Sequence, residues 1–121
     1  MQTLETLHLS QNLIADQGAQ YLADALTQNK ALTTLNLYWN HIGDLGAQSF
    51  VQTLQANNDL HTLLLSRNRI GNDSAKQFID VLKQNTTLTT LSLHENRIDQ
   101  QTQNYGKNIL KIHKGRVTVN W

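Results

Sequence analysis

The sequence repeats itself with a period of 28 residues, and this period constrains the fold more than any other feature. Leucine, asparagine and isoleucine return in phase in four successive units, near residues 4–31, 32–59, 60–87 and 88–115. The columns are Leu4/Leu32/Leu60/Leu88, Leu7/Leu35/Leu63/Leu91, Leu9/Leu37/Leu65/Leu93, Asn12/Asn40/Asn68/Asn96 and Ile14/Ile42/Ile70/Ile98. A period of this length indicates a structural unit that buries its apolar face by stacking against copies of itself. The whole chain, residues 1–121, is therefore predicted to form one domain.

Each unit reads as a strand followed by a helix. In the stretch L-x-x-L-x-L the last two leucines alternate with polar residues, which is the period of a half-buried strand. In the second half, apolar residues stand at helical spacing, as Leu22, Ala25 and Leu26 do in the first unit. An asparagine follows each strand where the chain turns, and its amide can satisfy backbone groups that lack ladder partners. Stacked together, these asparagines are expected to form a buried amide ladder.

Two further columns are predicted to cap the helices. The residues of the first column stand just ahead of each helix and are good N-caps: Asp16, Asp44 and Asn72. The residues of the second column fall just past the helix, where a left-handed C′ residue is expected: Asn29, Asn57 and Asn85. Much of the asparagine in this chain is therefore predicted to be structural.

These columns resemble the ribonuclease-inhibitor type of leucine-rich repeat, whose 28-residue unit reads LxxLxLxxNxIxxxGAxxLxxxL. The resemblance covers essentially the whole chain. It implies an α/β fold, a right-handed leucine-rich-repeat solenoid curved like a horseshoe, with a parallel β-sheet on the concave face and helices on the convex face. Proteins of this family act as enzyme inhibitors, as GTPase-activating scaffolds or as sensing domains of innate-immune receptors. Bacteria that live inside eukaryotic cells deliver similar repeat proteins as effectors.

The two ends of the stack are expected to differ. In the fourth unit Gly106 replaces the usual large apolar residue, and Gly115 is expected to follow the last helix as its C′ residue. Residues 116–121 then read as a terminal capping strand, with Val119 and Trp121 in the leucine columns. At the other end the first strand begins almost at once, so the N-terminal edge of the sheet is expected to be exposed.

The outward-facing columns of the predicted sheet select candidate binding residues. Residues 28 apart are side-by-side neighbours, about 4.8 Å from each other, in a parallel sheet. Tyr38, Trp39, Leu64 and Arg67 therefore fall on two adjacent strands, and Trp, Tyr and Arg are the residue types most enriched at interface hot spots. These four are predicted to be the centre of a partner-binding site. A polar fringe is predicted around them: His8, Asn36, His94 and Glu95.

Other interpretations of the same columns stay open. Trp39 could instead fold over the strand end and pack on the neighbouring rim side chains, or it could stack with Arg67, in both cases without contacting a partner. The unbroken threonine column, Thr6/Thr34/Thr62/Thr90/Thr118, is interpreted as a solubilising sheet surface.

Catalytic and metal chemistry find little support in the sequence. Ser66 and His94 share a column, and Glu95 stands beside the histidine. Serine, histidine and an acid are the residue types of a hydrolase triad. A triad needs a base oriented by a buried carboxylate, an oxyanion hole and a pocket, whereas these side chains are expected on a shallow open sheet. The histidines lack the spacing of metal sites and cysteine is absent, so no cofactor or metal is expected.

The charge pattern argues against two classes of partner. Lys and Arg number 10, Asp and Glu number 9, and no run of like charges exceeds two residues. Nucleic acids and anionic membranes attract clustered Lys and Arg, so neither is expected as a partner. The first residues lack the features of a secretory signal. N-x-S/T sequons at Asn72 and Asn85 coincide with predicted caps, which a glycan would disturb, so a cytoplasmic location is expected, or a host cytosol for a bacterial effector.

The sequence therefore predicts a non-enzymatic module that binds a partner protein through the concave sheet and the adjoining rim. The partner could be an enzyme whose active site is blocked, or a host protein if the chain is an effector. The alternative is a structural segment of a larger repeat protein, or a unit that self-associates through its N-terminal edge. A hydrolase using Ser66 and His94 is the least favoured function.

Overall fold

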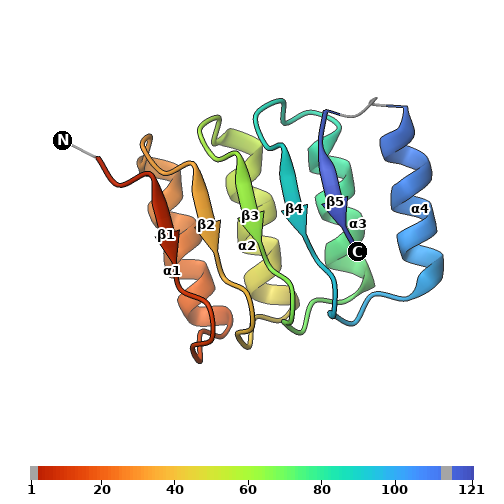
Figure 1. Cartoon of the computed structure of the whole chain (residues 1–121), viewed down its shortest axis with the longest axis horizontal. Coiled ribbons are helices and arrows are strands. Elements are labelled where there is room, and N and C mark those ends of the chain that lie inside the picture. Colours follow the sequence, from red (N-terminus) through yellow and green to blue (C-terminus); the bar gives the residue numbers. More distant parts are fainter. Residues whose placement is uncertain (1–2, 113–115) are drawn as a thin grey trace.

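The computed structural model describes residues 3–112 and 116–121, so the predicted C′ residue Gly115 lies outside the described residues. Strands and helices alternate along the chain. In order they are β1 (Thr6–His8), α1 (Asp16–Gln28), β2 (Thr34–Asn36), α2 (Asp44–Ala56), β3 (Thr62–Leu64), α3 (Asn72–Leu82), β4 (Thr90–Ser92), α4 (Gln100–Lys111) and β5 (Thr118–Asn120). The strands form one parallel sheet in the order β1-β2-β3-β4-β5, with the helices in a second layer behind it (Figure 1). The predicted α/β repeat solenoid is confirmed.

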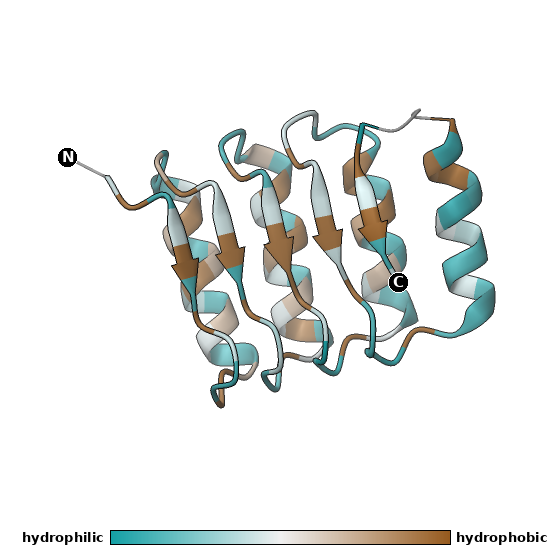
Figure 2. Ribbon diagram, viewed as in Figure 1, coloured by the Kyte–Doolittle hydropathy of each residue, from teal (hydrophilic) through white to brown (hydrophobic). Residues whose placement is uncertain are grey.

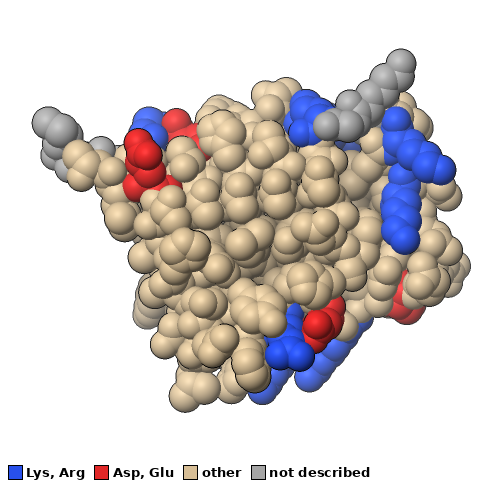
Figure 3. All heavy atoms as spheres, in the orientation of Figure 1, with Lys and Arg blue, Asp and Glu red and all other residues tan. Residues whose placement is uncertain are grey.

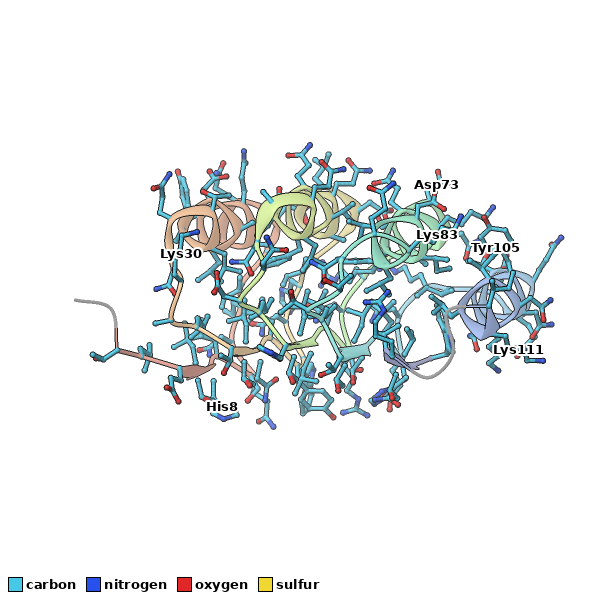
Figure 4. All side chains as sticks on the ribbon, turned by 90° about the horizontal axis from the view of Figure 1, so that it is seen from above. His8, Lys30, Asp73, Lys83, Tyr105 and Lys111 are labelled. Carbon is cyan, nitrogen blue, oxygen red and sulfur yellow. The ribbon has the colours of Figure 1, made fainter. Side chains whose placement is uncertain are left out.

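The 28-residue period is also the register of the sheet. Thr6 pairs with Thr34 and Leu7 with Leu35, and every later pair of strands keeps the same offset. The central residues of the strands, leucine in β1 to β4 and Val119 in β5, pack in or against the core and form a continuous apolar band across the sheet (Figure 2). Seen from above, the helices are spread more widely than the strands, and His8 points away from the helices (Figure 4). The open face of the sheet is therefore the inner, concave face.

The predicted asparagine ladder is present from the second repeat onward, whereas Asn12 of the first repeat is exposed and its amide bonds to carbonyls of its own repeat. Asn40 is buried, accepts a hydrogen bond on Oδ1 from the backbone N–H of Ile14 at 3.1 Å, and donates from Nδ2 to the carbonyl of Leu9 at 3.0 Å. Asn68 and Asn96 make the equivalent bonds to their own preceding repeats. The amides thus satisfy the backbone groups released where each strand ends, and they tie every repeat to the one before it.

The prediction of N-caps is wrong by one residue. Asp16 and Asp44 are the first residues of α1 and α2, and the cap residues before them, including Gly43, have extended backbone and make no side-chain cap. The carboxylate of Asp16 instead reaches sideways and accepts the backbone N–H groups of Gly43 at 2.7 Å and Gly46 at 3.0 Å. It therefore caps the next helix, α2, because adjacent helices begin side by side.

The fourth repeat has the cap in the expected form, one position earlier. Asp99 is the N-cap of α4 and accepts the backbone N–H of Thr102 at 2.8 Å. This bond is the largest cause that lowers the pKa of Asp99 below its usual value, with a smaller contribution from Asn72. Asn72, predicted to cap its own helix, exchanges two hydrogen bonds of 2.9 Å with Asp99.

The prediction of left-handed residues after the helices is also wrong. Asn29 and Asn57 have extended backbone, with φ of −88° and −80°. Their side chains turn the chain instead: Asn57 Oδ1 accepts the N–H of Leu60 at 2.8 Å, while Nδ2 donates to the carbonyl of Leu26 at 2.9 Å. Asn85 likewise donates to the carbonyl of the matching leucine, Leu54, in the preceding repeat. These amides form a second ladder at the other end of the repeats.

The C-terminal end of the stack is closed by the last strand and helix. Trp121 is partly buried against the core, and a Cβ added at Gly106 of α4 would collide with its ring. The guanidinium of Arg116 donates to the carbonyls of Leu82, the last residue of α3, and of Asn85, which follows that helix. The glycine that interrupts the repeat pattern at position 106 therefore makes room for the tryptophan.

Candidate protein-binding surface

The candidate residues at the rim share an unusual backbone conformation. Four consecutive repeats place one residue each in the left-handed region, at the position just before the ladder asparagine: Gln11, Trp39, Arg67 and Glu95, with φ of 57° to 58°. This geometry turns the chain out of the strand and exposes each of the four side chains at the carboxyl end of the sheet. A left-handed conformation costs an ordinary residue on the order of 1 kcal/mol, and bulky residues are uncommon in it. The backbone therefore does not favour tryptophan at position 39.

Side chains from three neighbouring repeats form a chain of contacts along this rim. The Tyr38 ring meets the Trp39 ring edge-on, with centroids 6.4 Å apart and an interplanar angle of 77°. The guanidinium carbon of Arg67 lies 4.9 Å from the centroid of the Trp39 ring, as a cation–π contact requires. On its other side Arg67 Nε donates to Glu95 Oε2 at 2.5 Å. Tyr38, Trp39, Arg67 and Glu95 are hereafter called the rim cluster.

The charges of the rim cluster stabilise each other. The hydrogen bond from Arg67 lowers the pKa of Glu95 below its usual value, and the same bond raises the pKa of Arg67, to which Tyr38 adds a smaller effect in the same direction. Both groups therefore stay ionised around neutral pH. Because the two side chains are 40% and 53% exposed, the pair contributes little to folding stability. Its main effect is to hold the guanidinium over Trp39.

Trp39 remains accessible in spite of these contacts. Its side chain stacks with Arg67, as the alternative interpretation of the sequence proposed, yet the residue is still 48% exposed. Leu64 lies in the neighbouring column, between Asn36 and Ser92 on the adjacent strands, and is partly exposed. The stack with Arg67 thus orients the indole without removing it from solvent.

The remaining fringe residues lie on the same face in smaller groups. Asn36 accepts the backbone N–H of Tyr38 at 2.9 Å, and its Nδ2 lies 3.2 Å from Nδ1 of His8. His94 is exposed, and its Nδ1 lies 2.8 Å from the hydroxyl of Ser66, which is buried. The structure therefore brings Asn36 together with Tyr38 at one end of the rim cluster, whereas His94 lies beside Glu95 at the other end.

The contacts of Ser66 and His94 do not build a catalytic triad. A triad carboxylate binds the ring nitrogen of the histidine opposite to the serine. Glu95, the acid beside His94, is instead paired with Arg67. Among the described residues no group of three or more His, Cys, Asp or Glu side chains is placed to hold a metal ion. In the same part of the chain no helix has both the length and the apolar content of a membrane span.

The sequence interpretation missed a hollow beside Trp39. The hollow has a volume of about 240 Å³ and is lined by Trp39 together with Gln11, Asn12, Leu13 and His41. Leu13 is 80% exposed, although it is a large apolar residue. Residues such as Leu13 and His41 lie beyond the strands, where the alternation that identified the other columns no longer applies.

Most of the sheet face is free of charge, and the charged side chains gather at its edges (Figure 3).

The fold and this surface define a repeat protein with an open concave sheet. The sequence model of the family described as "Leucine Rich repeat" matches residues 1–23, 28–51, 56–78 and 84–100. The chain therefore belongs to the leucine-rich repeat family, and the ribonuclease-inhibitor type suggested by its repeats is consistent with that match.

One solved structure with the same fold is "Leiomodin-1 Actin-Binding Site 2 (ABS2)", with a TM-score of 0.81 over 88% of the present chain. The chain spans 63% of the length of that structure, and the two sequences are 23% identical. At this identity the likeness establishes the fold and not a shared partner. No curated protein matches the chain by sequence.

Proposed function

We propose that this chain is a non-enzymatic protein-binding module that holds a partner protein against its concave sheet and adjoining rim. The centre of the proposed site is formed by Tyr38, Trp39, Leu64 and Arg67, with His8, Asn36, His94 and Glu95 around it. If the partner is an enzyme, covering its active site is a natural mechanism, because a stiff stack of repeats loses little freedom on binding. The location proposed for this function is the cytoplasm, or a host cytosol if the chain is a delivered effector.

The observation that carries the proposal is the indole of Trp39. It stands half exposed at a position where the left-handed backbone disfavours a large side chain, and neighbouring residues hold it in place. An aromatic side chain that is exposed and in contact with Arg and Tyr has the composition of an interface hot spot. A solvated rim would be served equally well by a polar residue, as Gln11 shows in the first repeat.

The structural neighbour gives general support to a protein partner. That structure is an actin-binding site of leiomodin-1, so in that protein a chain of the same fold is associated with binding another protein. Neither the identity of the partner nor its binding surface is carried over to the present chain.

Binding of a partner is expected to depend on Trp39. The change Trp39→Ala should reduce recovery of the partner from a lysate at least about ten-fold, because truncation of a hot-spot residue costs about 2 kcal/mol or more. Tyr38→Ala should have a similar but smaller effect. The measurement is a quantitative pull-down with mass-spectrometric identification, and circular dichroism verifies that each variant is folded.

Tyr21→Ala provides the matched control. Tyr21 is an aromatic residue on α1 that is 67% exposed, more than Trp39, but it belongs to the helix layer. Its truncation should leave recovery unchanged. Equal recovery of every bound protein by wild type and by folded Trp39→Ala would contradict the proposed site.

A second candidate function, self-association or extension of the stack, is favoured by the N-terminal edge. Leu4 is 56% exposed, and a hollow of about 110 Å³ opens there onto Leu7, Leu22 and Leu35. In the later repeats a preceding repeat covers the equivalent leucines. A concentration-dependent dimer in light scattering that is disrupted by Leu4→Glu would support this candidate, and a monomer at all concentrations would exclude self-association.

A further inference from the structure

Three of the chain's four arginines lie at one edge of the sheet, where the strands end. Arg67 belongs to the rim cluster. Arg69 and Arg97 follow two residues after the rim position of their repeats, and backbone hydrogen bonds fix them to the preceding repeat. Arg69 N–H donates to the carbonyl of Ile42 at 2.7 Å, and Arg97 N–H donates to the carbonyl of Ile70 at 2.8 Å. The spacing of the two arginines is therefore set by the stack of repeats.

These two arginines are available to a partner, whereas Arg67 is not. Arg67 is paired with Glu95 and stacked on Trp39. Arg69 and Arg97 are exposed, and within residues 3–112 and 116–121 neither forms an ion pair. In the space-filling view, Lys and Arg side chains project along this lower edge of the molecule (Figure 3).

Two of the acidic groups near this edge, Asp44 at the start of α2 and the N-cap Asp99 of α4, accept hydrogen bonds from neutral donors. Asp44 accepts the backbone N–H of Gly71 at 2.9 Å and the hydroxyl of Ser74 at 2.6 Å. Asp99 accepts the Thr102 N–H and an Asn72 amide. These carboxylates face the beginnings of the helices and do not pair with the arginines, so the guanidinium groups keep their hydrogen-bonding capacity for another acid.

The hollow beside Trp39, in which the apolar side chains of Trp39 and Leu13 stand among polar ones, continues the same edge toward the N-terminus. His41, which lines the hollow, occupies the column of Arg69 and Arg97, one repeat earlier, and its backbone N–H donates in the same way to the carbonyl of Ile14 at 2.8 Å. Two steps of a parallel sheet, from His41 to Arg97, cover about 10 Å, which an extended peptide spans in about three residues. An apolar side chain in the hollow and carboxylates on the arginines can therefore belong to one short segment.

We propose that the partner docks an acidic segment along this edge, with an apolar side chain in the hollow beside Trp39 and carboxylates paired with Arg69 and Arg97. This inference rests on the proposed function and specifies the chemistry of the partner. Arg presents a planar fork of donors that binds carboxylates in a bidentate manner. A nucleic acid is the less suitable occupant, because Glu95 stands within the edge and two free arginines neutralise few phosphates.

The test is selection of random peptides displayed on phage against the wild-type protein. The selected peptides are expected to be rich in Asp and Glu, with a leucine or an aromatic residue within about four positions of the acids. Each synthesised peptide should bind Arg69→Gln/Arg97→Gln roughly ten-fold or more weakly than wild type. The matched control is Lys107→Gln/Lys111→Gln, which removes the same charge from exposed positions of α4 and should leave affinity unchanged.

The outcomes separate this inference from the proposed function. The proposal of an acidic segment would be overturned if the selected peptides are neutral or basic, or if they bind the double-arginine variant as well as wild type. This holds even if Trp39→Ala abolishes their binding. Peptides insensitive to Trp39→Ala and to the arginine changes alike would count against both proposals. Single-stranded oligouridylate is the third probe. If it binds more tightly than the acidic peptides and loses its binding in the double-arginine variant, the occupant of this edge is a nucleic acid and not an acidic protein segment.

Discussion

Replacing Asn68 with alanine is expected to lower the free energy of unfolding by about 3 kcal/mol or more, because buried backbone groups would lose their partners. Asn68 Nδ2 donates to the carbonyls of Leu37, Leu65 and Ser66 at 3.0, 3.1 and 3.3 Å, and Oδ1 accepts the N–H of Ile42 at 2.9 Å. Water cannot readily replace these bonds, since Asn68 is 8% exposed. Urea denaturation followed by circular dichroism measures the loss.

The same column supplies the control for this prediction. Asn12 is exposed, and among the described residues its amide bonds only to the carbonyls of Leu9 and Ser10 in its own repeat. Asn12→Ala should therefore cost less than about 1 kcal/mol. If the two changes destabilise the protein equally, the amide ladder does not hold the repeats together as described.

The second large effect concerns the substitution Gly106→Ala, which is expected to destabilise the protein although replacing glycine with alanine inside a helix usually stabilises it. Alanine inside a helix is normally about 1 kcal/mol more favourable than glycine. In α4, however, a Cβ on residue 106 would collide with the ring of Trp121 and with Cδ1 of Ile79. Gly106→Ala should therefore destabilise the protein by about 1–3 kcal/mol, as overpacking of a filled core does.

A double-mutant cycle distinguishes this collision from a general intolerance of the helix. Trp121→Ala removes the ring, so Gly106→Ala should be less harmful, or stabilising, in that background. Thermal unfolding of the four proteins provides the four melting temperatures. A higher melting temperature for Gly106→Ala alone would show that Trp121 does not close the end of the stack.

The sequence predicted the repeat fold because each column records one neighbour relation. Residues 28 apart lie side by side, so the pairing of Thr6 with Thr34 and the stacking of the ladder asparagines follow from the period alone. The hydrogen bonds that cap the helices do not follow from the period. Asp16 caps the helix of the next repeat, and Asn57 Nδ2 donates to the carbonyl of Leu26 in the preceding repeat, so both side chains depend on the distance between repeats as well as on the local sequence.

The candidate site was predictable to a similar extent. The column rule brings Trp39 beside Arg67 and Arg67 beside Glu95, and the structure joins both pairs. It does not reveal the left-handed backbone of the rim or the hollow next to Leu13, because both arise from loops that follow the strands. It also does not show that Arg69 lacks an ion pair among the described residues, since the acids nearby are engaged with backbone and side-chain donors.

The most direct measurement of the central claim uses the two tryptophans of the chain, Trp39 at the rim and Trp121 at the C-terminal end of the stack. Protein labelled with 5-fluorotryptophan gives one fluorine resonance for each, which the change Trp121→Phe assigns. On titration with the partner recovered by pull-down, the resonance of Trp39 should shift or broaden while that of Trp121 stays in place. A shift of Trp121 alone, or an unchanged Trp39 resonance at saturating partner, would contradict binding at the concave sheet and rim.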